Sequence, residues 1–140
     1  MKCVVCDHDI RIDTLKQLFT LHPLLLCSRC AQKLVPKSMD VLYHDNDWIR
    51  SVIDKLNQGD LILIQLFKPH LQKALLKKGA IHSNISMIEA KKDLTYPWLE
   101  ILVNSIIEDS QRGYQNLSAE TLVVAVEAQK KTNHQIAIIG

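Results

Sequence analysis

The sequence predicts an α+β or incomplete α/β protein, in which a small zinc ribbon precedes a mostly helical domain. Three observations predict this class. The four cysteines form two C-x-x-C pairs near the start of the chain. The apolar fraction of 47% is sufficient for a core, and only four glycines and four prolines argue against a loop-rich protein. At 140 residues the chain can hold a metal-stabilised module, expected at 1–36, and a partial domain at 37–140.

The two cysteine pairs have the spacing of a tetrahedral zinc site. Cys3 and Cys6 form the first pair, Cys27 and Cys30 the second, and twenty residues lie between them. Zinc binds four thiolates at about 2.3 Å, and each C-x-x-C turn supplies two of them. Four thiolates complete the coordination shell and leave no position for water or substrate, so we expect a structural zinc ion and no catalytic residue at this site.

Other interpretations of the cysteines are less consistent with the sequence. Two disulfides would need an oxidising compartment, yet no apolar signal stretch follows Met1, so we expect a reducing cytoplasm. A thioredoxin-like redox site would need one C-x-x-C at the start of a helix after a strand, and two matched pairs argue against it. His8 and His22 lie close enough in sequence to replace a cysteine, but four thiolates do not need them.

The start of the second domain shows a strand followed by a capped helix. Residues 41–43 form a short apolar stretch of strand character, and an oxygen within Asp45-Asn46-Asp47 can cap the next helix. Apolar residues at three- and four-residue steps predict a helix over 48–56, which Gly59 ends.

The middle of the domain is predicted to be helix and then strand. Leucines at helical spacing indicate a helix over 60–78, in which Pro69 should introduce a kink or a split. Lys77-Lys78-Gly79 has the composition of a helix end, and 85–88 is a candidate strand.

The last third is predicted as helix, loop, helix and strand. Thr95-Tyr96-Pro97 resembles a helix start, and the residues of its buried stripe are Trp98, Ile101, Leu102, Ser105 and Ile106. A polar loop is expected over 109–116. Ser118 is expected to cap a helix to about Lys131, with Leu122, Val123, Val126 and Gln129 facing inward. The apolar run 135–139 then indicates a buried parallel strand that completes a β-α-β unit.

The order of these features resembles the ComF family of competence-associated proteins, which join an N-terminal cysteine zinc module to a type I phosphoribosyltransferase-like domain. The matching features are Cys3-x-x-Cys6, Cys27-x-x-Cys30, Leu42-Tyr43, Lys55, Gly59-Asp60, the segment Gln111–Leu117 with Ser118-Ala119-Glu120, and the strand Gln135–Ile139. The resemblance implies a phosphoribosyltransferase-like fold and a role in DNA uptake.

The chain departs from the family's catalytic pattern. The resemblance implies two acidic residues and a Thr-Thr-Gly turn after Ile136–Ile139, where this sequence ends at Gly140. A Val-Pro strand and an arginine-glycine-phenylalanine-asparagine signature would fall near 85–88 and 91–98, and neither motif is present. We therefore interpret the chain as a truncated or degenerate ComF-like protein that need not be an enzyme, with no catalytic or cofactor-binding residue besides the zinc ligands.

Three functions follow from this interpretation. The first is a non-catalytic adaptor that docks a DNA-uptake motor protein or single-stranded DNA. The second is a phosphoribosyltransferase-like enzyme that uses phosphoribosyl pyrophosphate, and the third is a remnant without function. The net charge of +2 gives no field of the kind that non-specific nucleic-acid binding uses, and no apolar run is long enough to cross a bilayer.

Other candidate residues have simpler structural roles. Asp45, Asp47 and Asp60 stand beside helix starts, where aspartates more often cap than bind metal. The histidines His44, His70, His82 and His134 show no ligand spacing. Trp48 and Trp98 lie on apolar stripes and are expected in the core.

Overall fold

The computed structural model describes residues 2–9, 26–78, 84–89, 96–109, 121–130 and 134–140. Its centre is a four-stranded sheet in the order β1-β4-β3-β2, and every neighbouring pair of strands is parallel. Helices and strands are therefore mixed along the chain, as the sequence predicted. Within the described segments, no helix has both the length and the apolar character that crossing a membrane requires.

The strand β1 (Val41–Tyr43) and the helix α3 (Asp47–Asn57) confirm the strand and the capped helix predicted for this part of the chain. Asn46 is the residue that caps α3, because its Oδ1 accepts a hydrogen bond of 2.9 Å from the N–H of Ile49. Gly59 follows the helix with a φ of 104°, a left-handed conformation that glycine adopts without strain.

The helical segment after Gly59 changes from a 3₁₀ turn to an α-helix before it reaches Pro69, and it is not interrupted at Pro69. A 3₁₀ turn, η1 (Leu61–Leu63), leads directly into α4 (Ile64–Lys77), and α4 continues through Pro69. Pro69 has no N–H to donate to the carbonyl of Gln65, but the buried leucine face of α4 spans both sides of this position. The predicted split at Pro69 is therefore wrong.

The next two elements also confirm the sequence prediction. The strand β2 (Asn84–Ile88) lies at one edge of the sheet, and α5 (Trp98–Asp109) begins directly after Pro97. Trp98 is fully buried, and its Nε1–H donates a 2.8 Å hydrogen bond to Oδ1 of Asn57 at the end of α3. The predicted polar loop over 109–116 lies outside the described residues except for Asp109, which ends α5.

The helix predicted over 118–131 is wrong where the structure describes it. Residues Thr121–Glu127 form the strand β3, which pairs with β2 on one side and β4 on the other. Both neighbours are parallel, and Leu122, Val124, Ala125 and Val126 are buried. Three valines in a continuous apolar run fit a central parallel strand, because β-branched side chains pack well on a pleated surface.

The strand β4 (Gln135–Ile139) confirms the predicted final strand, although the element before it is β3 and not a helix. It lies between β1 and β3, in register with Ala137 opposite both Val41 and Ala125. The side chain of Gln135 bonds twice to the backbone of Gln129, at 2.9 and 2.7 Å. This pair of bonds ties the start of β4 to the segment that follows β3.

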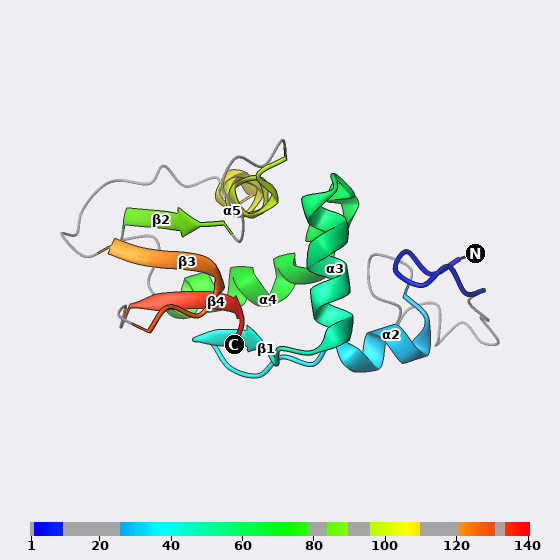
Figure 1. The fold of residues 1–140 in the computed structure, drawn as a ribbon. Helices are drawn as coiled ribbons and strands as arrows, with labels where there is room; N and C mark the ends of the chain where they lie inside the picture. Colours follow the sequence, from blue (N-terminus) through cyan, green and yellow to red (C-terminus); the bar gives the residue numbers. More distant parts are fainter. Residues whose placement is uncertain (1, 10–25, 79–83, 90–95, 110–120, 131–133) are drawn as a thin grey trace.

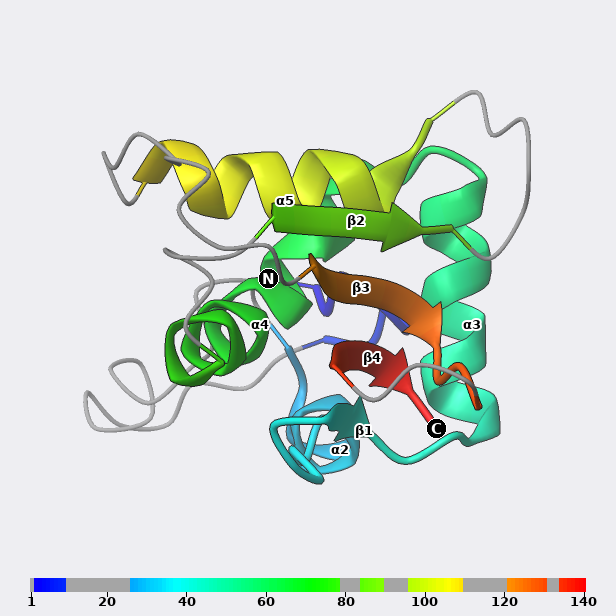
Figure 2. The same ribbon diagram turned by 90° about the vertical axis from the view of Figure 1, so that its left-hand side faces the viewer.

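The helices α3, α4 and α5 lie on one side of the sheet (Figure 1). The view from the sheet side shows all four strands in front of them (Figure 2). The short helix α2 (Ser28–Lys33) and the N-terminal turn lie beyond α3, on the side away from the sheet (Figure 1). One continuous core joins these parts, since Cys3, Val5 and Cys30 belong to the same buried cluster as the sheet and helix residues.

Candidate metal centre

The first cysteine pair lies on a tight turn. The N–H of Cys3 donates to the carbonyl of His8 at 2.9 Å, and the N–H of Asp7 donates to the carbonyl of Cys3 at 3.0 Å. Asp7 has a φ of 61°, a left-handed conformation that aspartate tolerates better than most residues. An isolated antiparallel bridge between Lys2 and Asp9 closes the turn. These bonds fix the backbone so that Cys3 and Cys6 lie on one side of a closed loop.

The second cysteine pair lies at the start of α2. Cys27 is the N-cap residue, and its carbonyl accepts a 2.9 Å hydrogen bond from the N–H of Ala31. Cys30 lies within α2 and is its buried residue. A redox C-x-x-C would also lie at the start of a helix. Here, however, the first cysteine pair lies beside the second, with 3.5 Å between Sγ of Cys6 and Sγ of Cys27.

The four sulfur atoms converge as the sequence predicted. All of them lie within 4.8 Å of one another, and all four thiols are free. A tetrahedron with metal–sulfur bonds of about 2.3 Å has sulfur–sulfur edges of about 3.8 Å. The separations therefore fit a single metal ion with four thiolate ligands. Among the described residues, this is the one group of cysteine, histidine and acidic side chains with such convergence.

The protonation of the thiols also fits a metal-binding cluster. Burial raises the pKa of Cys3, but hydrogen bonds from the backbone of Cys27, Cys6 and Val5 outweigh burial, and the pKa falls from 9.0 to about 6. Burial raises the pKa of Cys30 to about 12. The acidic thiol of Cys3 can start metal capture, and the metal then displaces the protons of the remaining thiols.

His8 lies at the rim of the cluster. Its Nδ1 is 3.3 Å from Sγ of Cys6 and 3.2 Å from the carbonyl oxygen of Cys6. Because the four sulfurs already complete a tetrahedral set, this contact suits a hydrogen-bond donor to a thiolate better than a fifth ligand. His22, the other nearby histidine in sequence, lies outside the described residues.

Two residues of α3 contact the cysteine module, and neither was predicted from the sequence to belong to the site. The ammonium of Lys55 donates a hydrogen bond to the carbonyl oxygen of Val5, between the first two cysteines. Trp48 is only partly buried and packs against the shared core. The sequence signal available for Lys55 was its place on an otherwise apolar helix face. No pattern near Lys55 indicates that its partner is the carbonyl of Val5.

The remaining candidates do not join the cluster. Asp45 pairs with Arg50 at 2.7 Å, and Asp47 occupies the first turn of α3. His70 bonds to the hydroxyl of Tyr43, with 2.6 Å between Nδ1 and the phenolic oxygen. Burial raises the pKa of that phenol, so Tyr43 stays neutral. The cap of α3 is Asn46, so Asp45 and Asp47 do not take the capping role that the sequence favoured.

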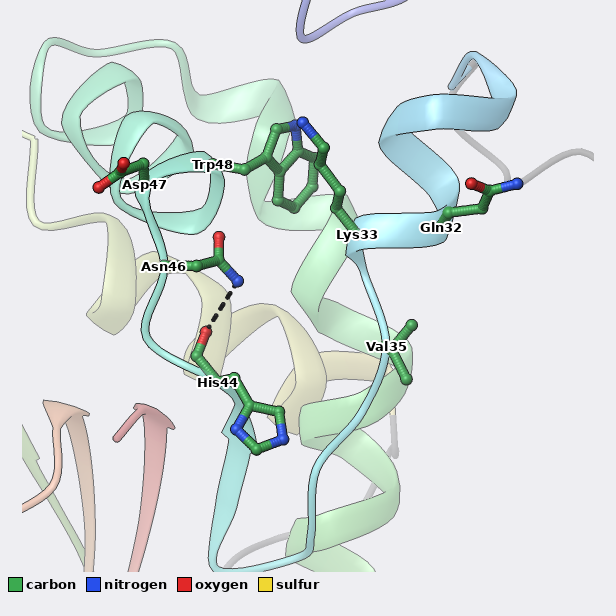
Figure 3. A pocket seen from close by; sticks show the side chains of 7 residues that line it. All are labelled: Gln32, Lys33, Val35, His44, Asn46, Asp47 and Trp48. Carbon is green, nitrogen blue, oxygen red and sulfur yellow. Dashed lines mark hydrogen bonds between the residues drawn. The ribbon is translucent and has the colours of Figure 1, made fainter.

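A pocket of about 420 Å³ lies beside the metal centre (Figure 3). One wall comes from α2 and the segment after it, and the other from the end of β1 and the start of α3; its residues are Gln32, Lys33, Val35, His44, Asn46, Asp47 and Trp48. Figure 3 shows the Lys33 side chain extending from α2 toward the indole of Trp48. The expectation that Trp48 is a core residue is therefore only partly correct, because its ring also forms a wall of this pocket.

A scan against models of protein families, a search of curated proteins and a search of solved structures each gave no match.

Proposed function

We propose that this protein is a zinc-binding, non-catalytic binding module. A single ion held by Cys3, Cys6, Cys27 and Cys30 fixes the N-terminal segments against α3. The observation that supports this proposal is the convergence of the four sulfur atoms within 4.8 Å. A tetrahedral set of four thiolates suits zinc, a metal that such sites commonly hold, and it leaves no open coordination position for chemistry.

The pocket beside the centre supports a binding role. It has an aromatic wall at Trp48 and carries charges of both signs, at Lys33 and Asp47. The two walls belong to segments that the cysteine cluster and α3 hold together. Metal loss is expected to separate the walls, so that partner binding depends on zinc.

The sequence resemblance to the ComF family supplies the proposed setting, an adaptor in the cytoplasmic machinery of DNA uptake. The experiment is to delete the gene in its source organism and measure transformation frequency. We expect a loss of transformation that the wild-type gene restores and a Cys27→Ser gene does not. Unchanged transformation in the deletion strain would contradict the adaptor role. Binding of a fluorescent oligothymidylate to the purified chain, with and without a chelator, distinguishes DNA from a protein as the partner.

A phosphoribosyl pyrophosphate-dependent enzyme is the second candidate, and the all-parallel sheet favours it. Open parallel sheets bind ligands at the carboxyl ends of their strands. Here this edge carries Arg50, bridged between Asp45 and Glu127. Because these carboxylates occupy the guanidinium, we expect no saturable heat when phosphoribosyl pyrophosphate and Mg²⁺ are titrated into the protein. Micromolar binding would favour the enzyme over the adaptor.

A further inference from the structure

The helix α3 presents two polar donors to the cysteine module from one face. Trp48 and Lys55 are seven positions apart, which is about two turns of an α-helix and brings them to the same side. Val52 lies between them and is fully buried. This face contacts the cysteine module, since Lys55 bonds to Val5. The helix α2 lies beside α3, on the side away from the sheet (Figure 1).

The first donor is the indole of Trp48. Its Nε1 is buried, and no hydrogen bond of ordinary length reaches it within the described residues. The group that it approaches is the thiol of Cys30, which lies within hydrogen-bonding reach of the Trp48 side chain. Sulfur accepts hydrogen bonds at longer distances than oxygen, so a thiolate at this position satisfies a buried N–H that would otherwise lack an acceptor.

The second donor is the ammonium of Lys55, which bonds to the carbonyl oxygen of Val5. Val5 lies between Cys3 and Cys6 and is buried. A zinc ion with four thiolates has a net charge of about −2, and burying this charge requires compensation from cations and N–H dipoles. Lys55 brings a positive charge to the backbone of the first turn, while Trp48 brings an N–H dipole to α2.

We propose that Trp48 and Lys55 are positioning residues of the metal centre, with the indole N–H donating to Sγ of Cys30 and the ammonium holding the first cysteine turn through the Val5 carbonyl. This inference rests on the proposed metal site. It extends the site, because it adds two side chains of α3 to the groups that orient the metal ligands. Groups that orient metal ligands commonly contribute roughly 10- to 100-fold to metal affinity.

The first test uses the two tryptophans of the chain as a matched pair. Trp48→Phe keeps an aromatic ring and removes the N–H, and Trp98→Phe does the same at a site where the N–H bonds to Asn57 instead of sulfur. Each protein is loaded with Co²⁺, and the thiolate-to-cobalt charge-transfer band is recorded. We expect a shift to lower energy in Trp48→Phe alone, since a thiolate that loses a hydrogen bond becomes a stronger electron donor.

The second readout is the rate at which zinc passes to a chelator. Trp48→Phe is expected to lose zinc roughly 10-fold faster than the wild type. For the lysine, Lys55→Met keeps most of the aliphatic stem and removes the charge. Lys68→Met is its control, because Lys68 of α4 donates to Oγ of Ser105 on α5 at 2.8 Å. We expect faster loss from Lys55→Met than from Lys68→Met.

The outcomes separate this inference from the proposed function. A wild-type protein that takes up neither Co²⁺ nor zinc contradicts the metal site itself. A wild-type protein that binds both metals, with an identical charge-transfer band and chelator rate in Trp48→Phe and Trp98→Phe, overturns the role of Trp48 and leaves the metal site in place. Equal rates in Lys55→Met and Lys68→Met overturn the role of Lys55.

Discussion

Arg50 of α3 and Glu127 at the end of β3 form an ion pair, with 2.6 Å between Nη1 and Oε1. The same guanidinium holds Asp45 through two bonds, Nε to Oδ1 at 2.8 Å and Nη2 to Oδ2 at 2.7 Å. One side chain therefore joins the first turns of α3 to the loop after β1 and to the central strand β3. About half of each partner's side chain at the Arg50–Glu127 pair is exposed, so water and salt weaken the interaction.

The first prediction concerns the titration of Asp45. The hydrogen bonds from Arg50 hold the pKa of Asp45 below its ordinary 3.8. Because the folded-state pKa is depressed, the stabilisation is present above the ordinary pKa and is lost as the pH falls through the folded pKa. In Arg50→Met the midpoint measured by carboxyl-carbon NMR should rise toward 3.8. Lys77→Met, at an exposed position of α4, should leave it unchanged, and an unshifted midpoint in Arg50→Met contradicts the pairing.

The second prediction concerns the core of the sheet. Ile136 of β4 is fully buried, and its register partner is Val124 of β3. Ile136→Ala removes buried methyl and methylene groups and leaves a cavity, so we expect a loss of about 2–5 kcal/mol in the free energy of unfolding, measured with urea. Ser86→Ala, at an exposed position of β2, is the control and should change it by less than about 0.5 kcal/mol. A near-neutral effect of Ile136→Ala would argue against the placement of β4.

A third prediction follows from the position of β3 between two parallel neighbours. Its N–H groups are held in ladders on both sides, whereas β1 and β2 are edge strands in the described sheet. Hydrogen exchange measured by NMR should therefore be slower for Val124 and Ala125 than for Leu42. Exchange of these two amides at the rate of exposed amides would be evidence against the strand.

The elements with strong local signals were predictable from the sequence. Asn46 precedes an amphipathic run and caps α3, and Gly59 takes the left-handed conformation that ends it. The two cysteine pairs predicted the cluster of four sulfur atoms, because C-x-x-C spacing places two ligand atoms within one turn. In each case the sequence signal lies within a few residues along the chain, although the cysteine cluster also joins two pairs that are distant in sequence.

The parts that the sequence analysis missed depend on distant partners. The segment Thr121–Glu127 was predicted as a helix from caps and spacing, but its neighbours β2 and β4 supply the hydrogen bonds that make it a strand. Its valines were the available signal for a strand. Lys55 and Val5 are fifty residues apart, and no pattern near either residue indicates that they meet.

A fourth prediction concerns protons displaced by the metal. Zinc binds thiolates, so protons compete with it and its affinity falls as the pH falls. Backbone hydrogen bonds outweigh burial and hold the pKa of Cys3 at about 6. Below that pH Cys3 is protonated before zinc arrives, and we expect the number of protons released per zinc to rise by up to about one. Calorimetry in buffers of different ionisation enthalpy measures this number; a constant value across that range is inconsistent with an acidic Cys3.

The metal content of the freshly purified protein tests the central claim most directly. Elemental analysis of the wild type, paired with native mass spectrometry, should find one zinc ion per chain, because the four sulfur atoms form a single site. Cys27→Ser, which removes one of the four ligands, should retain much less zinc. A wild-type protein that contains no zinc and binds none when it is supplied, with its thiols free or joined as disulfides, would contradict the account.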